Sequence, residues 1–325
     1  MRWLEMVVFK DSFADFVDNC DGVKVYFVND ANEIKDSDID NNALENFRES
    51  FCKSLRNKYT ESDNFSLIKL SNYDERDNSL FQYDFDEADK PFEFGLTEQA
   101  LKFDITKPVE LYKVKNDKLN NIKSSIVVLT NSKTDFSIAF FQHVFPVSLL
   151  GPDKGLLNLT THKTRVVKLE CDVLKINANF VFMQIKDDFF VENVKVFENS
   201  LHFKKVIHSR AKNYAAKIVA LGLIEDPTKF NERIDAETAF ARKVVKAYKN
   251  SVVIREKIPN QDIVEFVEKR EYYSSHLKAA DDRLSFKLDS IGKCKKFLEL
   301  LDDDFLKSEL TNRHYLARSK DLVNA

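Results

Sequence analysis

The sequence has little glycine, with 6 glycines among 325 residues, whereas roughly 7% of the residues of an average protein are glycine. The common loops that cradle nucleotide phosphates need glycines at fixed spacing, either in a GxGxxG turn or ahead of a Lys-Ser/Thr pair. Gly151 and Gly155 lie close together, but no Lys-Ser/Thr pair follows them at the required spacing. This pattern argues against nucleotide binding by either loop, and we expect no cofactor.

Cysteine and histidine are also sparse. None of the four cysteines belongs to a Cys-X-X-Cys pair, and the six histidines are scattered along the chain. A tetrahedral zinc site needs clustered ligands, and a secreted disulfide scaffold needs denser cysteines. We therefore expect no metal site, and we expect reduced, structural thiols at Cys20, Cys52, Cys171 and Cys294.

Long apolar runs are missing as well. The longest, such as residues 126–129 and 138–141, have the length of a strand, whereas a membrane-spanning helix needs about 20 apolar residues. The first three residues lead into acidic and polar residues, without the apolar segment of a signal peptide. These features predict a cytoplasmic protein.

The net charge of −3 conceals an asymmetry along the chain. Residues 1–110 contain 13 Lys and Arg against 25 Asp and Glu, which leaves 37 basic and 28 acidic residues for the remainder. Such an imbalance bears on partners rather than on fold. It fits two unrelated solvated faces, and it also fits an acidic first third that pairs with the basic remainder, within the chain or between subunits.

The spacing of apolar residues in the first third predicts an α/β region. Residues 23–28 and 66–70 have the pattern of strands, and residues 42–59 have apolar residues at helical spacing. Residues 71–89 are acidic and show no clear period, which is typical of a loop or of irregular edge strands.

The middle of the chain is rich in Val, Ile and Phe, which half-buried strands favour. We expect an antiparallel sheet of about five strands, with a hairpin at residues 131–134. The strands are expected at residues 124–130, 136–145, 164–170, 179–186 and 189–194. The remainder is mainly helical, with helix starts near Pro227 and Pro259. The prediction is an α+β fold, with a central, largely antiparallel sheet and a helical C-terminal third. It divides into an acidic region at residues 1–118 and a core at residues 119–325.

The strongest electrostatic feature is a predicted helix between residues 204 and 217, with five basic residues and no acid. Its apolar residues form one stripe and its cations lie on other faces, so it could follow a row of phosphates. It also fits an ordinary helix whose cations pair with carboxylates elsewhere. The candidate DNA-binding residues of this helix are Lys204, Lys205, His208, Arg210, Lys212 and Lys217. Lys163 and Arg165 are weaker candidates, because alternate residues of a strand point to the same side.

A metal-dependent nuclease would need acidic residues on adjacent strands and a nearby lysine. Asp153 could begin such a pattern, but residues 168–172 offer Glu-X-Asp where Glu-X-Lys is required. The sequence has no Gly-X-Ser-X-Gly elbow for a nucleophilic serine either. Catalysis is therefore not favoured, and a nuclease would depend on Asp153 and Glu170.

Near the C-terminus, residues 300–311 read Leu-Leu-Asp-Asp-Asp-Phe-Leu-Lys-Ser-Glu-Leu-Thr, and Tyr315 and Ser319-Lys320 follow. We expect the three aspartates to end one helix at Leu301 and to cap a further helical turn over residues 305–310. The run resembles the closing pattern of the KwaB-like family, Leu-Leu-X-Asp-Asp-aromatic-Leu-X-Ser-X-Leu-Thr before a Tyr and a Ser-Lys pair. Two predicted strands over residues 180–191 that lead into Phe197-Glu198 also resemble that family.

The resemblance covers roughly the last two-thirds of the chain. It implies a component of the Kiwa antiphage system that works with a membrane-spanning partner, KwaA, at the inner face of the inner membrane. It also implies sequence-independent binding to double-stranded phage DNA, which would block replication and transcription, and self-association as a homodimer or higher oligomer. The expected function is therefore a non-catalytic DNA-binding effector. The alternatives are a scaffold protein of a membrane-associated defence complex and a metal-dependent nuclease.

Overall fold

The structure, a computed structural model, describes residues 2–62, 65–76, 78–103, 109–111, 119–150, 159–162, 165–168, 172–282, 284–303, 305–307 and 314–316. The chain divides into two compact units. Unit 1 comprises residues 1–68, 77–83 and 90–201, and unit 2 comprises residues 69–76, 84–89 and 202–325. Two short segments of the first third, of which residues 84–89 are strongly acidic, therefore belong to unit 2. The predicted sequence regions, 1–118 and 119–325, stay a prediction.

Unit 1 is built on an eight-stranded sheet with the strand order β2-β1-β5-β6-β11-β12-β4-β3. Its strands are β1 (Gly22–Asn29), β2 (Ile34–Asp36), β3 (Ser66–Lys69), β4 (Ser79–Gln82), β5 (Ile122–Asn131), β6 (Phe136–His143), β11 (Phe182–Ile185) and β12 (Asp188–Val191). The pairings of β1 with β2 and β5, of β6 with β5 and β11, and of β12 with β11 and β4 are all antiparallel. Two small pairs join β7 (Leu149–Leu150) to β10 (Val173–Leu174) and β8 (Leu159–His162) to β9 (Arg165–Lys168).

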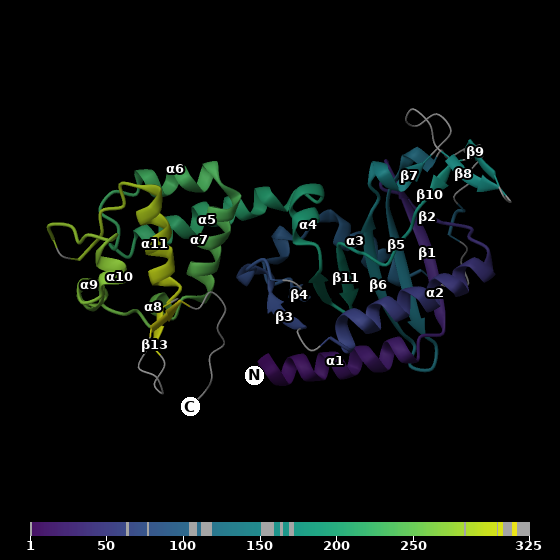
Figure 1. The fold of residues 1–325 in the computed structure, drawn as a ribbon, viewed down its shortest axis with the longest axis horizontal. Coiled ribbons are helices and arrows are strands. Elements are labelled where there is room, and N and C mark those ends of the chain that lie inside the picture. The colour runs from purple at the N-terminus through teal and green to yellow at the C-terminus, as the bar shows by residue number, and fades with distance from the viewer. Residues whose placement is uncertain are drawn as a thin grey trace. The chain divides into compact units, whose positions relative to one another are not determined.

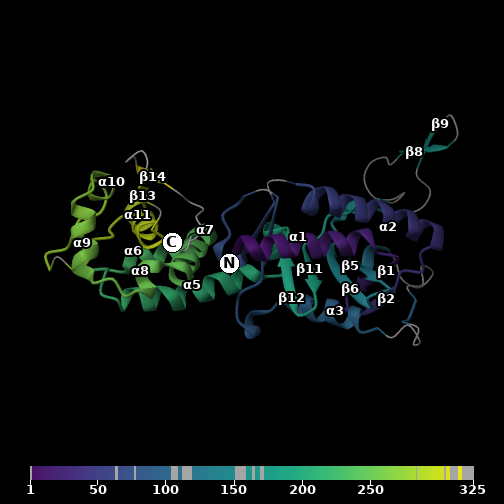
Figure 2. The same cartoon turned by 90° about the horizontal axis from the view of Figure 1, so that it is seen from below.

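Helices cover both faces of the sheet because its side chains alternate between two buried sides. Val25 and Phe27 of β1 share one core with residues of α1 (Arg2–Asp18) and α2 (Asn41–Leu55). On the opposite face, Phe94 of α3 (Phe92–Leu101) stacks on Phe189 with ring centroids 3.8 Å apart. Figures 1 and 2 show α1 and α2 along one face of the strands and α3 along the other. The short helix α4 (Val194–Ser200) ends unit 1.

Unit 2 is mainly helical in its described part. Its helices are α5 (Phe203–Val219), α6 (Thr228–Ala236), α7 (Thr238–Asn250), α8 (Val252–Arg255), α9 (Asn260–Glu268), α10 (Glu271–Ser274) and α11 (Ile291–Leu301). The aromatic rings of Phe230, Phe240, Phe286 and Phe297 contact one another in its core, and each side chain is at most 1% exposed. This packing holds α6, α7 and α11 together.

The prediction of an α+β fold with a largely antiparallel sheet is confirmed, and so is the hairpin between β5 and β6. The sheet is larger than the five strands expected, because β1 to β4 of the first third join it. Residues 79–82, expected in a loop or at an edge, form β4 between β12 and β3, where Leu80 and Phe81 are buried. The predicted strand at residues 164–170 contains β9, which pairs with β8 outside the main sheet.

The helical turn predicted for residues 305–310 is wrong at its start. Helix α11 ends at Leu301, and Phe305–Lys307 is a strand, β13, paired with β14 (His314–Leu316). Asp303 adopts a left-handed conformation with φ 52°, which stops the helix. Asp302 forms an ion pair with Lys246 of α7 instead of capping a further turn.

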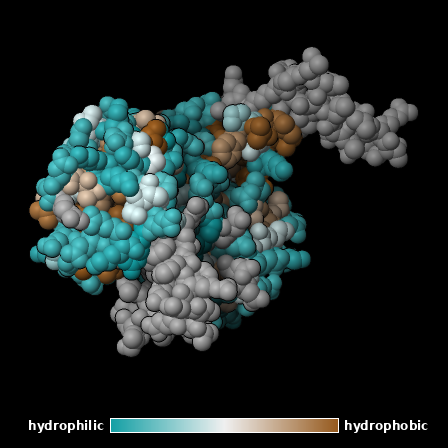
Figure 3. All heavy atoms as spheres, turned by 60° about the vertical axis from the view of Figure 1, so that its left-hand side comes forward, coloured by the Kyte–Doolittle hydropathy of each residue, from teal (hydrophilic) through white to brown (hydrophobic). Residues whose placement is uncertain are grey.

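Within the described residues, none of the helices is long and apolar enough to cross a membrane. Figure 3 shows one face, on which hydrophilic residues predominate and hydrophobic residues form small, separate groups. Exposed large apolar side chains of unit 2 include Leu221, Ile258, Leu284 and Ile291. Single exposed apolar residues of this kind are ordinary on a protein surface.

Candidate nucleic-acid interface

Helix α5 carries six of the eight predicted DNA-binding residues and is anchored along one apolar stripe. The buried residues of the stripe are Phe203, Ile207, Ala211, Ala215 and Ile218. Their spacing of three and four residues places them on one side of the helix. The helix contains no acidic residue, so its remaining faces carry only neutral and positive side chains.

Lys204, Lys205 and Lys217 are exposed, and no ion pair holds any of them among the residues that the structure describes. Lys204 and Lys217 lie at opposite ends of α5, about 20 Å apart along the axis at 1.5 Å per residue. The Lys217 Nζ lies 5.5 Å and 5.3 Å from the ring centroids of Tyr214 and Tyr248, which stack on each other. These three cations are free to meet phosphates.

The other three candidates of α5 have partners of unequal strength. Arg210 forms ion pairs of 2.6 Å with both Asp86 and Asp89, and the hydrogen bond to Asp89 raises the pKa of the guanidinium. The Arg210 and Asp89 side chains are 25% and 15% exposed, whereas Lys212 and Asp235 are 60% and 61% exposed in their 2.7 Å pair. An exposed pair of this kind contributes about 0–1 kcal/mol, so Lys212 can exchange its carboxylate for a phosphate.

The partner of His208 is a neutral hydroxyl, since its Nε2 lies 3.0 Å from the Thr238 Oγ1 at the start of α7. Of the two candidates outside α5, Lys163 lies outside the described residues. Arg165 begins β9 opposite His162, and its side chain lies outside the described part. The six candidates of α5 therefore lie together on one helix, whereas the side chains of Lys163 and Arg165 lie outside the described part.

Helix α7 is a second acid-free helix, which sequence reasoning missed. It packs against α5 in the same direction, because Thr238 contacts His208 near its start and Tyr248 stacks on Tyr214 near its end. Its sequence, TAFARKVVKAYKN, has four basic residues and no acid. Lys243 is exposed and lacks an ion pair among the described residues. The count of charges that identified α5 would also have identified α7.

Residues 84–89 of the first third supply the carboxylates that occupy Arg210 of α5 and Lys249 of α7. Asp84 accepts from the Lys249 Nζ of α7 at 3.1 Å, and from the Ser71 backbone amide at 2.9 Å. Asp86 and Asp89 hold Arg210 of α5 as described. These contacts lie within unit 2. Part of the basic charge of α5 and α7 is therefore neutralised by residues more than a hundred positions earlier.

A cavity of about 300 Å³ lies between α7, α11 and residues 73–75. Opposite charges line it in pairs, since Arg242 lies 4.0 Å from Glu75 and Lys246 lies 2.6 Å from Asp302. Lys243 also lines the cavity, so its charges are mixed in sign rather than of one sign.

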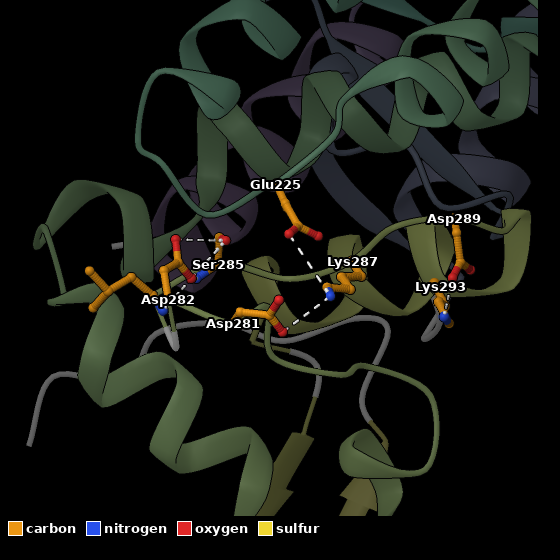
Figure 4. Close-up of polar contacts among 8 residues, drawn as sticks. Glu225, Asp281, Asp282, Ser285, Lys287, Asp289 and Lys293 are labelled. Carbon is orange, nitrogen blue, oxygen red and sulfur yellow. Dashed lines mark hydrogen bonds and ion pairs between the residues drawn. The ribbon is translucent and has the colours of Figure 1, made fainter.

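Acidic residues before α6 and before α11 are engaged in local contacts. Figure 4 shows Lys287 between Glu225 and Asp281, at 4.0 Å and 3.4 Å, and Lys293 beside Asp289 at 2.7 Å. Among the described residues, no group of three His, Cys, Asp or Glu side chains is arranged to hold a metal ion. Asp153 and Glu170, on which a nuclease would depend, lie outside the described part of the chain.

The family model described as "Kiwa protein KwaB-like" matches residues 119–311. Kiwa protein KwaB of Escherichia coli O55:H7 (strain RM12579 / EPEC) is 29% identical over 318 residues, which cover 97% of this chain and 98% of that protein. No solved structure matches the chain. The match confirms the resemblance at residues 300–311 and extends it over most of the sequence. Because the family pattern spans more than half of the chain, this protein belongs to the KwaB-like family of Kiwa proteins.

Proposed function

We propose that this protein is a non-catalytic, DNA-binding effector of a bacterial antiphage defence system, and that α5 and α7 form its phosphate-binding surface. The observation that carries the proposal is the pair of packed, acid-free helices with lysines that no carboxylate occupies in the described structure. Membership of the Kiwa family supports the antiphage role.

The proposed contacts are Lys204, Lys205, Lys212 and Lys217 of α5, with Lys243 of α7. Lys205 and Lys212 are seven residues apart, about two helical turns, and so share one side of α5. The length of α5 between Lys204 and Lys217, about 20 Å, corresponds to about six base pairs of duplex. His208 and Arg210 would act by fixing α5 to its neighbours, and Lys163 with Arg165 stay further predicted contacts.

Such a surface recognises phosphates and not base edges, so binding to double-stranded phage DNA would be independent of sequence. Coating of the DNA would block its replication and transcription. We also propose, from family membership alone, that the protein forms homo-oligomers and acts at the inner face of the inner membrane through the membrane protein KwaA.

The test is binding of the full-length protein to a random duplex of about 40 base pairs at several salt concentrations, with magnesium present and the DNA checked for cleavage. Each phosphate contact contributes about 0.9 to the slope of log affinity against log salt. The variant K204E/K205E should therefore lower both the affinity, at least about tenfold, and the slope, by about 2. Uncut DNA is expected throughout.

The matched control is K269E/K278E, which changes the charge equally at two exposed lysines of the same unit outside α5 and α7. It should bind almost as the wild type does. Equal losses in both variants would mean that only net charge matters, and unchanged binding by K204E/K205E would remove α5 from the interface. Absence of binding by the wild type would favour the scaffold role, and cleaved DNA would favour the nuclease.

A further inference from the structure

Two of the scattered cysteines meet in the core of unit 1. Cys20 lies between the end of α1 and the start of β1, and Cys52 lies in α2. Both belong to the same hydrophobic core cluster, and they are 4% and 6% exposed. Their thiols form a hydrogen bond with each other, and both are free. This contact brings together two nucleophiles 32 positions apart.

A positive charge stands beside the pair. Arg48, one turn before Cys52 on α2, donates to the backbone carbonyl of Cys20, and its guanidinium interacts electrostatically with both thiols. The hydrogen bond from Cys52, aided by Arg48, lowers the pKa of Cys20 to about 7 despite its burial. The same hydrogen bond, together with burial, raises the pKa of Cys52. At neutral pH a large fraction of the molecules therefore carries a thiolate at Cys20 beside a thiol at Cys52.

A groove reaches the pair from the side of Cys52. Its volume is about 400 Å³, and Cys52 lies in its lining with Arg48, Lys53 and Arg56. Thiolate character and access together decide which cysteines react with oxidants. Cys294, in contrast, is buried in unit 2 with no thiol of the described residues beside it, and burial raises its pKa to about 11.

We propose that Cys20 and Cys52 form a redox-active dithiol site, which peroxides convert into an intramolecular disulfide. The Cys20 thiolate attacks one oxygen of hydrogen peroxide, the O–O bond breaks, and hydroxide leaves, which gives a sulfenic acid at Cys20. Cys52 then gives its proton to the hydroxide, and its sulfur attacks the Cys20 sulfur and displaces a second hydroxide. That hydroxide takes up from water the proton that Cys20 released when it ionised, so two thiols and one peroxide give one disulfide and two waters. The two sulfurs lose two electrons, and the peroxide gains them.

The order of the two steps follows from the charges. While Cys20 is a thiolate, its charge holds the proton on Cys52. Once Cys20 is an uncharged sulfenic acid, this effect ends, and Arg48 and Arg56 favour the Cys52 thiolate. The disulfide would tie the segment between α1 and β1 to α2 at the edge of the groove. This inference is independent of the proposed DNA binding.

The test is oxidation of the reduced, full-length protein with hydrogen peroxide, followed by alkylation of free thiols, intact mass measurement and peptide mapping without reductant. The expected product has lost two hydrogen atoms and contains a linked pair of peptides with Cys20 and Cys52, and dithiothreitol restores both thiols. Oxidation of Cys20 to sulfinic acid without linkage, linkage to another cysteine, or no linkage at all would overturn the proposal. This measurement on the wild type needs no variant to fold.

Two variants sharpen the result. In Cys52→Ser, the sulfenic acid at Cys20 has no partner and should be trapped by dimedone, whereas the wild type should give at least about tenfold less adduct. Cys294→Ser is the matched control, and it should form the disulfide at the wild-type rate. Equal dimedone labelling of the wild type and Cys52→Ser would show that Cys52 does not resolve the sulfenic acid.

Discussion

The two units of this protein use charged residues in different ways. In unit 1, Glu192 is only 10% exposed, and it accepts hydrogen bonds from the Tyr59 hydroxyl at 2.6 Å and the Phe180 amide at 3.1 Å, beside Lys58. In unit 2, charged residues line the outer faces of helices and join elements distant in sequence, as Asp84, Asp86 and Asp89 do with α5 and α7. Glu192 thus lies against the aromatic core of unit 1, whereas Asp84, Asp86 and Asp89 tie a segment of the first third to the helices of unit 2.

The difference shows how a cation that holds the fold can be distinguished from one that can bind a ligand. A partly buried pair such as Arg210 with Asp89 loses its water on folding, so breaking it leaves a carboxylate without a partner. An exposed lysine without an ion pair, such as Lys205, keeps its hydration and contributes little to stability. Exposure and pairing therefore assign different roles to residues five positions apart on one helix.

The largest effect is expected in the aromatic core of unit 1. Phe140 of β6 is fully buried, and its ring lies 5.1 Å from those of Phe51 and Phe180. Phe140→Ala should lower the free energy of unfolding by about 3–5 kcal/mol, because it removes these contacts and leaves a cavity. Urea unfolding followed by circular dichroism measures the change. In the control Phe92→Ala, which alters a 63% exposed ring of the same unit, the change should stay within about 0.5 kcal/mol, and equal losses would contradict the assigned core.

A smaller effect on stability is expected where a charge holds unit 2 together. Arg210→Met keeps the aliphatic stem but leaves Asp86 and Asp89 without this partner, which should cost about 1.5–3 kcal/mol in unfolding free energy. Its DNA affinity, measured on folded protein, should fall less than that of K204E/K205E. Lys205→Met is the control, with stability within about 0.5 kcal/mol of the wild type. If Arg210→Met instead lost affinity and kept its stability, Arg210 would be a DNA contact.

The sequence predicted those features that depend on neighbours along the chain. The hairpin of β5 and β6 and the buried stripe of α5 follow from local alternation and helical spacing. The place of β4 between β12 and β3 depends on pairing across more than a hundred residues, which local patterns do not encode. The carboxylates of Arg210 were unpredictable for the same reason. The end of α11 at Leu301 was predicted correctly, but the strand that follows the left-handed Asp303 was not. The acid-free composition of α7, however, was visible in the sequence.

The smallest expected effect is on the pH dependence of stability, which differs between the two units. Burial, with a contribution from Lys123, lowers the pKa of His143 in unit 1 below 6.5, so the unfolded chain binds a proton there more readily than the folded one does. Protonation of His143 therefore favours the unfolded chain, and the free energy of unfolding decreases as the pH falls below 6.5. His143→Gln should flatten this part of the pH profile of the urea midpoint. In unit 2, the hydrogen bonds from Thr228 lower the pKa of Asp226 below 3.8, so its contribution is present above that pH and is lost only at more acidic values. An unchanged slope below pH 6.5 in His143→Gln would contradict the assignment of this slope to His143.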